Sequence, residues 1–91
     1  MKWIIAYDVS KARGRRRVAK RLEQVGFRRQ KSVFEGEASP ADIGLLLDEL
    51  LEFIQADHDT LTAWPMTENG PARIQHRGNP RAVVQRDWMV L

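Results

Sequence analysis

Apolar and polar positions alternate along the chain in blocks that predict strands and helices in turn. Residues 2–8 are almost continuously apolar, which is typical of a strand covered on both faces. From Lys11 onward, apolar side chains recur at helical spacing, and Gly26 is the kind of residue that follows a helix C-terminus. We therefore predict a strand over residues 2–8 and a helix from Lys11 to about Val25.

The pattern from Phe27 to Ala38 is extended, and it leaves two structures open. Either two short strands reverse tightly near residues 30–32, or one strand carries a kink. A second helix is predicted next, because Ser39 is a good N-cap and Pro40 suits the first helical position. Its apolar stripe consists of Ile43, Leu46, Leu47, Leu50 and Ile54.

A further strand is predicted over residues 61–66, where Pro65 interrupts the pairing. The order of elements fits a ferredoxin-like α+β sandwich, βαββαβ, with two helices on one face of an antiparallel sheet. The other face of that sheet has no helix to cover it, although the first strand is apolar on both sides. We therefore predict a homodimer that packs sheet to sheet.

The C-terminal part of the chain has the least regular pattern. Turn residues at 69–71 precede a short extended stretch, and the chain ends in an apolar run at 88–91. Such an end needs a surface to pack against. We predict a single domain with a core at residues 1–66 and a C-terminal extension at residues 67–91, which adds a strand and docks on the partner subunit.

Composition narrows the class of protein. The chain has 91 residues with 43% hydrophobic content, enough for one domain with a modest core. Because there is no cysteine, a disulfide framework and a thiolate metal site are both excluded. The apolar runs are too short to span a bilayer, and Met1-Lys2 leads directly into a strand rather than a signal peptide. A cytoplasmic protein without a membrane partner is predicted.

The net charge of +3 is distributed unevenly. Between Lys11 and Lys31 there are ten Lys or Arg residues and one acid, Glu23, whereas from Glu35 to Asp59 there are eight acids and no Lys or Arg. A basic segment this dense favours nucleic acid as a partner. The alternative is a basic helix face that simply contacts solvent.

Asp8 is the main candidate for chemistry. It ends the first strand just before the arginines at positions 13–17, and an aspartate at a strand end can hold Mg²⁺ or another divalent cation. Guanidinium groups beside it can bind the phosphates of nucleic acid. The alternative role is structural, with Asp8 accepting from the backbone N–H groups of Ser10 and Lys11.

The arginines differ in their predicted direction around the helix. Arg13 and Arg16 point away from the apolar stripe, Arg17 lies on one flank, and Arg15 lies over the core side, nearest Asp8. Cations in a first helical turn oppose the helix dipole, so a bound phosphate at this helix start would relieve an unfavourable interaction.

Other chemically suggestive residues are predicted to be ordinary. His58 and His76 lack the partner spacing of a zinc site or a catalytic triad, so both are expected at the surface. Trp64 and Trp88 are expected to pack in the core or an interface rather than stack on bases.

Three segments together resemble a known family. They are Tyr7-Asp8-Val9-Ser10, the arginines that precede Val18-Ala19, and the segment from Gln30 to Gly36. This combination is similar to the small CRISPR-associated adaptation protein, a family of compact dimers that accompany the spacer integrase and are often described as metal-dependent endoribonucleases. The resemblance extends from the first strand to residue 66.

The resemblance implies roles for individual residues. Asp8 matches the metal-binding catalytic aspartate of the family, and Tyr7 matches its neighbour at the strand end. Arg15 and Arg17 match helix-start positions. Two later positions, Arg28 and Phe34, match residues linked to activity, with Arg29 left open as the alternative to Arg28.

Three functions remain open from the sequence. The first is a homodimer of CRISPR spacer acquisition that binds nucleic acid with the integrase subunit and has Mg²⁺-dependent endonuclease activity at Asp8, on single-stranded RNA or duplex DNA. The second is a catalytically idle DNA-binding scaffold of the same complex. The third is a stand-alone ribonuclease toxin. An RNA-recognition module is less favoured because its aromatic base-stacking pattern is missing.

Overall fold

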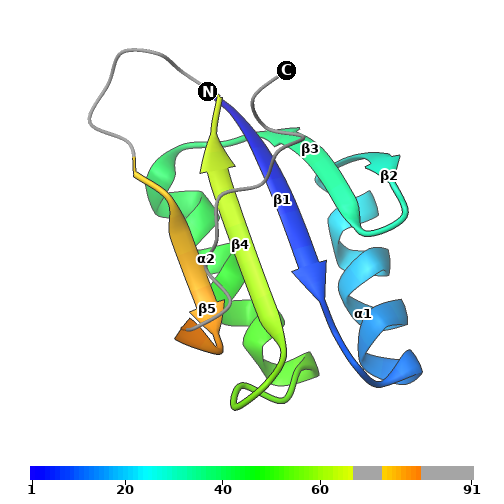
Figure 1. The fold of residues 1–91 in the computed structure, drawn as a ribbon. Coiled ribbons are helices and arrows are strands. Elements are labelled where there is room, and N and C mark those ends of the chain that lie inside the picture. The colour runs from blue at the N-terminus through cyan, green and yellow to red at the C-terminus, as the bar shows by residue number, and fades with distance from the viewer. Residues whose placement is uncertain (67–72, 81–91) are drawn as a thin grey trace.

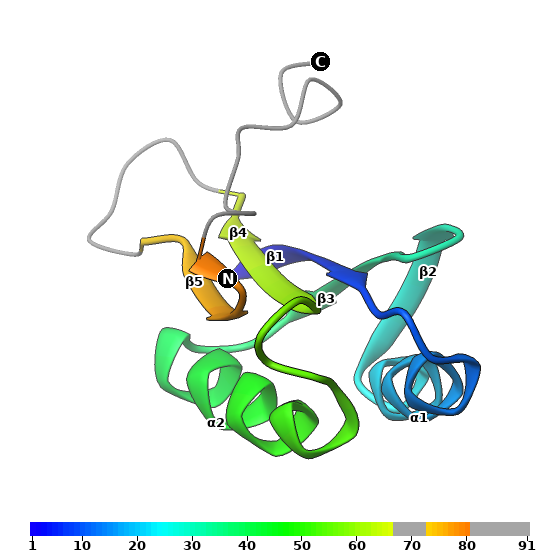
Figure 2. The same cartoon turned by 60° about the horizontal axis from the view of Figure 1, so that its bottom comes forward.

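The computed structural model describes residues 1–66 and 73–80. The described elements are β1 (Lys2–Asp8), α1 (Ala12–Glu23), β2 (Gly26–Gln30), β3 (Val33–Glu37), α2 (Pro40–Leu50), the 3₁₀ turn η1 (Leu51–Phe53), β4 (Thr60–Pro65) and β5 (Gln75–Gly78). The strands form one antiparallel sheet in the order β2-β3-β1-β4-β5, and α1 and α2 lie side by side on one face (Figures 1 and 2). The predicted ferredoxin-like α+β sandwich is confirmed.

The first half of the chain follows the predicted pattern closely. β1 occupies residues 2–8 as predicted, and α1 ends at Glu23, two residues before the predicted end. It ends there because Gln24 and Val25 already donate to carbonyls three residues back, in a tight final turn. For the following segment, the sequence left open two short strands or one kinked strand. The structure has two strands, β2 and β3, which form a hairpin with Lys31 and Ser32 at the turn.

The second helix begins as predicted and ends early. The hydroxyl of Ser39 accepts a hydrogen bond from the backbone N–H of Asp42 at 3.1 Å, and Pro40 is the first helical residue. α2 ends at Leu50, because the chain tightens into η1. Ile54 therefore lies beyond the helix, although it still packs against the core.

Both faces of β1 carry apolar side chains, as its sequence predicts. Trp3, Ile5 and Tyr7 face the helices, where they pack in the main core with residues such as Leu22 and Leu47. A smaller cluster on the opposite face consists of Ile4, Val33 and Trp64, with Ala6 packed against it. Trp64 is thus a packing residue, as expected. The structure is of one chain, so sheet-to-sheet pairing of two copies stays a prediction.

The predicted extra strand is present as β5, and it extends the sheet of its own chain. It pairs antiparallel with β4, with Thr62 opposite His76. The Gln75 amide donates to the Pro40 carbonyl at 2.8 Å, and Arg77 forms an ion pair with Asp48 at 2.7 Å, so β5 is fastened to α2 as well as to β4. Docking of the rest of the extension on a partner subunit falls largely on residues 67–72 and 81–91, which lie outside the described residues.

Within the described part of the chain, neither helix has the length and apolar character that a membrane crossing requires.

Candidate functional site

Asp8 lies where β1 leaves the sheet, and its side chain is exposed. Among the described residues, no hydrogen bond or ion pair engages its carboxylate. The predicted alternative role as a cap is therefore wrong, because the N–H of Ser10 donates instead to Asp59 and the N-cap residue Lys11 has no side-chain cap bond. The carboxylate of Asp8 is free to take a ligand.

Two hollows meet at Asp8, one on each side of the sheet. The hollow toward α1 has a volume of about 580 Å³, and the one on the helix-free face has a volume of about 280 Å³. The larger hollow is lined by Tyr7, Asp8, Val9, Arg15, Arg16, Ala19, Arg28, Lys31 and Ser32. Four of these side chains are cationic and one is acidic, so the larger hollow is suited to an anionic ligand.

Arg15 and Arg16 line the same hollow as Asp8, but among the described residues only Arg15 has hydrogen-bond partners there. The Nη1 atom of Arg15 donates to the carbonyls of Val9 at 3.1 Å and Ser10 at 2.9 Å. These bonds satisfy a guanidinium that the helix dipole would otherwise disfavour, and they hold the loop that follows Asp8. Arg13 lies outside this hollow.

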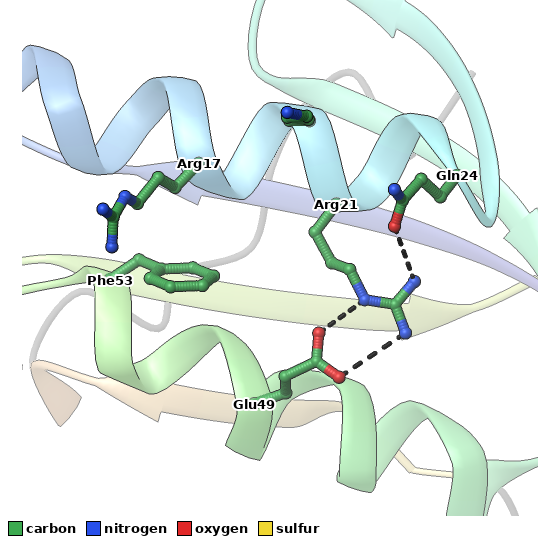
Figure 3. Close-up of a pocket in the computed structure, with 6 residues that line it drawn as sticks. Arg17, Arg21, Gln24, Glu49 and Phe53 are labelled. Carbon is green, nitrogen blue, oxygen red and sulfur yellow. Dashed lines mark hydrogen bonds and ion pairs between the residues drawn. The ribbon is translucent and has the colours of Figure 1, made fainter.

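Arg17 also lies away from Asp8. Its guanidinium lies over the ring of Phe53, 5.6 Å from the centroid, and lines a different hollow (Figure 3). Of the four predicted nucleic-acid-binding arginines of α1, the structure therefore brings Arg15 and Arg16 to Asp8 and leaves Arg13 and Arg17 elsewhere.

Arg28, rather than Arg29, faces the larger hollow. Its guanidinium lies 5.0 Å from the centroid of the Phe34 ring and donates to the Lys31 carbonyl at 2.7 Å and to Glu23 at 3.2 Å. Arg29 instead pairs with Glu35 on the other face of the sheet. Phe34, which the resemblance links to activity, does not line the hollow; its ring is only 1% exposed and lies beneath the Arg28 guanidinium.

Tyr7 lies at the floor of the hollow on the helix side of β1. The side chain is buried, its ring centroid lies 6.2 Å from that of Phe34, and its hydroxyl donates to the Lys31 carbonyl at 3.5 Å. Burial raises the pKa of Tyr7 above its usual 10.0, against the opposing charge of Arg28. Tyr7 is therefore neutral at physiological pH and serves as a hydrogen-bond donor rather than a base.

Asp59 is a residue that the sequence did not single out. It is 2% exposed, and its carboxylate accepts from the backbone N–H of Ser10 at 3.0 Å and of Gln55 at 2.8 Å. Burial alone raises the pKa of Asp59, but these backbone donors outweigh it and the net pKa is lowered. The only sequence signal was an acid directly before a buried strand. Asp59 thus ties the loop after β1 to the loop before β4.

The two histidines have different surroundings. His58 is exposed, as predicted, and lies beside Asp57 at 3.1 Å. His76 is not a plain surface residue, because its ring nitrogens bond to the Thr62 hydroxyl and the Asn79 carbonyl, both at 2.8 Å. No group of three or more His, Asp or Glu side chains in the described part of the chain is arranged to hold a metal ion. Trp88 lies outside the described residues.

The family model described as CRISPR associated protein Cas2 matches residues 1–74. The chain belongs to the Cas2 family. The motifs around Tyr7-Asp8 and the β2–β3 hairpin lie within this matched stretch, and the resemblance seen in the sequence is confirmed.

Two similar proteins are named as CRISPR-associated endoribonucleases Cas2. The protein from Synechocystis sp. is 32% identical over 86% of this chain and 85% of its own length. The protein from Archaeoglobus fulgidus is 35% identical over 71% of this chain and 70% of its own. The crystal structure of Streptococcus pyogenes Cas2 superposes with a TM-score of 0.67, at 28% identity, over 76% of this chain and 89% of that one.

We expect Asp59→Ala to destabilise the protein by roughly 2–4 kcal/mol, because two part-buried backbone N–H groups lose a charged acceptor. The lowered pKa means that this stabilisation is present above the unfolded-state pKa of Asp and is lost as the pH falls through the lower, folded-state value. Urea unfolding of wild type and Asp59→Ala at several pH values measures the difference between their free energies of unfolding, which should shrink in acid.

The matched control is Asp57→Ala, because Asp57 is an exposed acid two positions away. Its effect should stay within about 0.5 kcal/mol. Equal losses for the two variants, or a difference that grows in acid, would contradict the role given to Asp59.

Proposed function

We propose that the protein is a CRISPR-associated nuclease that hydrolyses phosphodiester bonds in the hollow at Asp8 and acts in spacer acquisition. The observation that carries this proposal is an exposed carboxylate, without a bond to any other described residue, in a hollow lined by four cations. Membership of the Cas2 family and the names of its endoribonuclease relatives support it.

The cations bind and orient the nucleic acid. Arg15 and Arg28 are each fixed by backbone carbonyls, so they lose little freedom when a phosphate binds. Arg16 has no protein partner among the described residues and is available to the same phosphate. The hydroxyl of Tyr7 donates to the Lys31 carbonyl, which also accepts from Arg28, so Tyr7 helps to hold the turn that borders the hollow.

Mg²⁺ or another divalent cation fits the site as a weakly held cofactor. Asp8 offers one free carboxylate per chain, and Mg²⁺ prefers oxygen ligands while keeping several waters. In a homodimer, a second Asp8 across the twofold axis would add another ligand. When bound, the cation acts as a Lewis acid that offsets charge on the phosphodiester. The chain's own part is to hold the ion through Asp8 and the phosphate through Arg15, Arg16 and Arg28.

A second function, as a nucleic-acid scaffold for the integrase subunit, is favoured by the outer face of α1. Arg13, Arg16 and Lys20 recur at intervals of three and four residues, so they share one face and span about 10 Å. None of them is paired with an acid among the described residues. Such a row suits successive backbone phosphates of duplex DNA or single-stranded RNA. The two functions are compatible in one homodimer.

Asp8→Asn tests the nuclease. Because Asp8 is exposed and makes no bond among the described residues, stability should change by less than about 0.5 kcal/mol. Cleavage of labelled single-stranded RNA or duplex DNA in Mg²⁺ should fall at least about 100-fold. Gel analysis of the products, with Mg²⁺ and with a chelator, measures how cleavage depends on Asp8 and on the metal ion. Cleavage by the variant at the wild-type rate would refute the chemistry at Asp8.

The double variant Arg13→Gln with Arg16→Gln tests the scaffold. Each lost phosphate contact should reduce the slope of log affinity against log salt by about one, so duplex binding should weaken with a slope smaller by about two. Fluorescence anisotropy over a series of salt concentrations measures both the affinity and its salt slope. Arg73→Gln is the control, because Arg73 is an exposed cation ahead of β5. An unchanged slope in the double variant would contradict the scaffold role.

A further inference from the structure

α1 separates two hollows that share no lining residue. One contains Asp8. The other has a volume of about 260 Å³ and lies on the flank of α1 that faces Phe53 and Glu49 (Figure 3). The second hollow is lined by Arg17, Lys20, Arg21, Gln24, Glu49 and Phe53. None of these residues serves the chemistry proposed at Asp8, and Lys20 alone also belongs to the row of cations on the outer face of α1.

Close packing of η1 on α1 creates this hollow. A Cβ atom at Gly14 would lie 2.3 Å from the Phe53 carbonyl oxygen, so only glycine lets the two backbones approach this closely. The approach places the Phe53 ring beside α1, one turn from Gly14, where the Arg17 guanidinium lies over it at 5.6 Å. The guanidinium is thereby within cation–π distance of the ring.

The charges lining the hollow do not cancel. Arg21 and Glu49 neutralise each other through contacts of 2.5 Å and 3.5 Å, and Arg21 also donates to the Gln24 side chain at 3.4 Å (Figure 3). Arg17 and Lys20 have no acidic partner among the described residues. Two cations are thus left to bind an anion, one of them within cation–π distance of an aromatic ring.

We propose that this hollow is a second binding site for the backbone of a nucleic acid. Arg17 and Lys20 bind a phosphodiester, and a base stacks on the surface formed by Arg17 and Phe53. Planar guanidinium groups and aromatic rings both accept stacked bases regardless of sequence. This inference rests on the proposed function only in taking nucleic acid as the ligand.

The placement of the two hollows has a consequence for strand length. They lie on opposite flanks of a helix whose diameter with side chains is about 10 Å. Only a strand of several nucleotides can occupy the Asp8 hollow, cross the outer face of α1 and reach Phe53. The second site therefore holds the part of a long strand that lies away from the bond to be cleaved.

The test compares the RNA affinity of Lys20→Gln and Phe53→Leu with that of wild type. The probe is fluorescently labelled single-stranded RNA of about 20 nucleotides, which is longer than the stretch that one binding site covers. A chelator is present, so that the RNA is bound without being cleaved. Each variant should weaken binding roughly fivefold. Lys20→Gln should also reduce the salt slope by about one, whereas Phe53→Leu should leave the slope unchanged. In cleavage assays, Phe53→Leu should raise KM and leave kcat unchanged.

The matched control is Lys11→Gln, which removes the same charge from an exposed position outside both hollows. Equal weakening by Lys11→Gln and Lys20→Gln would overturn the proposal, since the effect would then be general electrostatic attraction. Wild-type affinity in Phe53→Leu would overturn it too. If Phe53→Leu does not fold, Arg17→Lys keeps the charge, loses the planar stack and should weaken binding similarly.

Failure of this site and failure of the proposed nuclease are distinguishable. Loss of cleavage in Asp8→Asn with unchanged binding in the Lys20 and Phe53 variants would leave the nuclease standing and remove the second site. Weakened binding in those variants with full cleavage in Asp8→Asn would support the second site and remove the chemistry from Asp8.

Discussion

The double pairing of β1 is the constraint on which the rest of the structure depends. β1 is hydrogen-bonded to β3 on one edge and to β4 on the other, and both of its faces carry buried apolar side chains. A strand held in this way has no freedom to slip, because a shift of one residue would exchange its two faces. Asp8, its last residue, therefore emerges at a fixed point at the edge of the core.

The loop after Asp8 is held from two sides by opposite charges. The Asp59 carboxylate accepts from the N–H of Ser10, while the Arg15 guanidinium donates to the carbonyls of Val9 and Ser10. The backbone that leads from Asp8 to α1 is thus fixed without using Asp8 itself. An aspartate that is positioned by its neighbours and has no partner of its own among the described residues is suited to bind a ligand.

Ion pairing decides which cations remain available. The acids between Glu35 and Asp59 include three that pair with cations from elsewhere in the chain: Glu35 with Arg29, Asp48 with Arg77, and Glu49 with Arg21. These pairs cancel part of the charge asymmetry that the sequence displays. What is left is concentrated on α1, where cations line the Asp8 hollow on one flank and the Phe53 hollow on the other.

The sequence by itself determined the order and type of the elements, the two-faced burial of β1, the cap at Ser39 and the position of Asp8 at the end of the first strand. These are local properties, because they follow from hydrophobic periodicity, from the Ser39-Pro40 helix start and from residues that are adjacent in the sequence. Only the tertiary structure decided the partners of the charged side chains. It showed that Phe34 lies beneath Arg28, that the Arg17 guanidinium lies over the Phe53 ring, and that Asp59 holds the loop after β1. Each of these contacts joins residues from different elements, and helical angle or strand alternation specifies a direction for a side chain but not what it meets there.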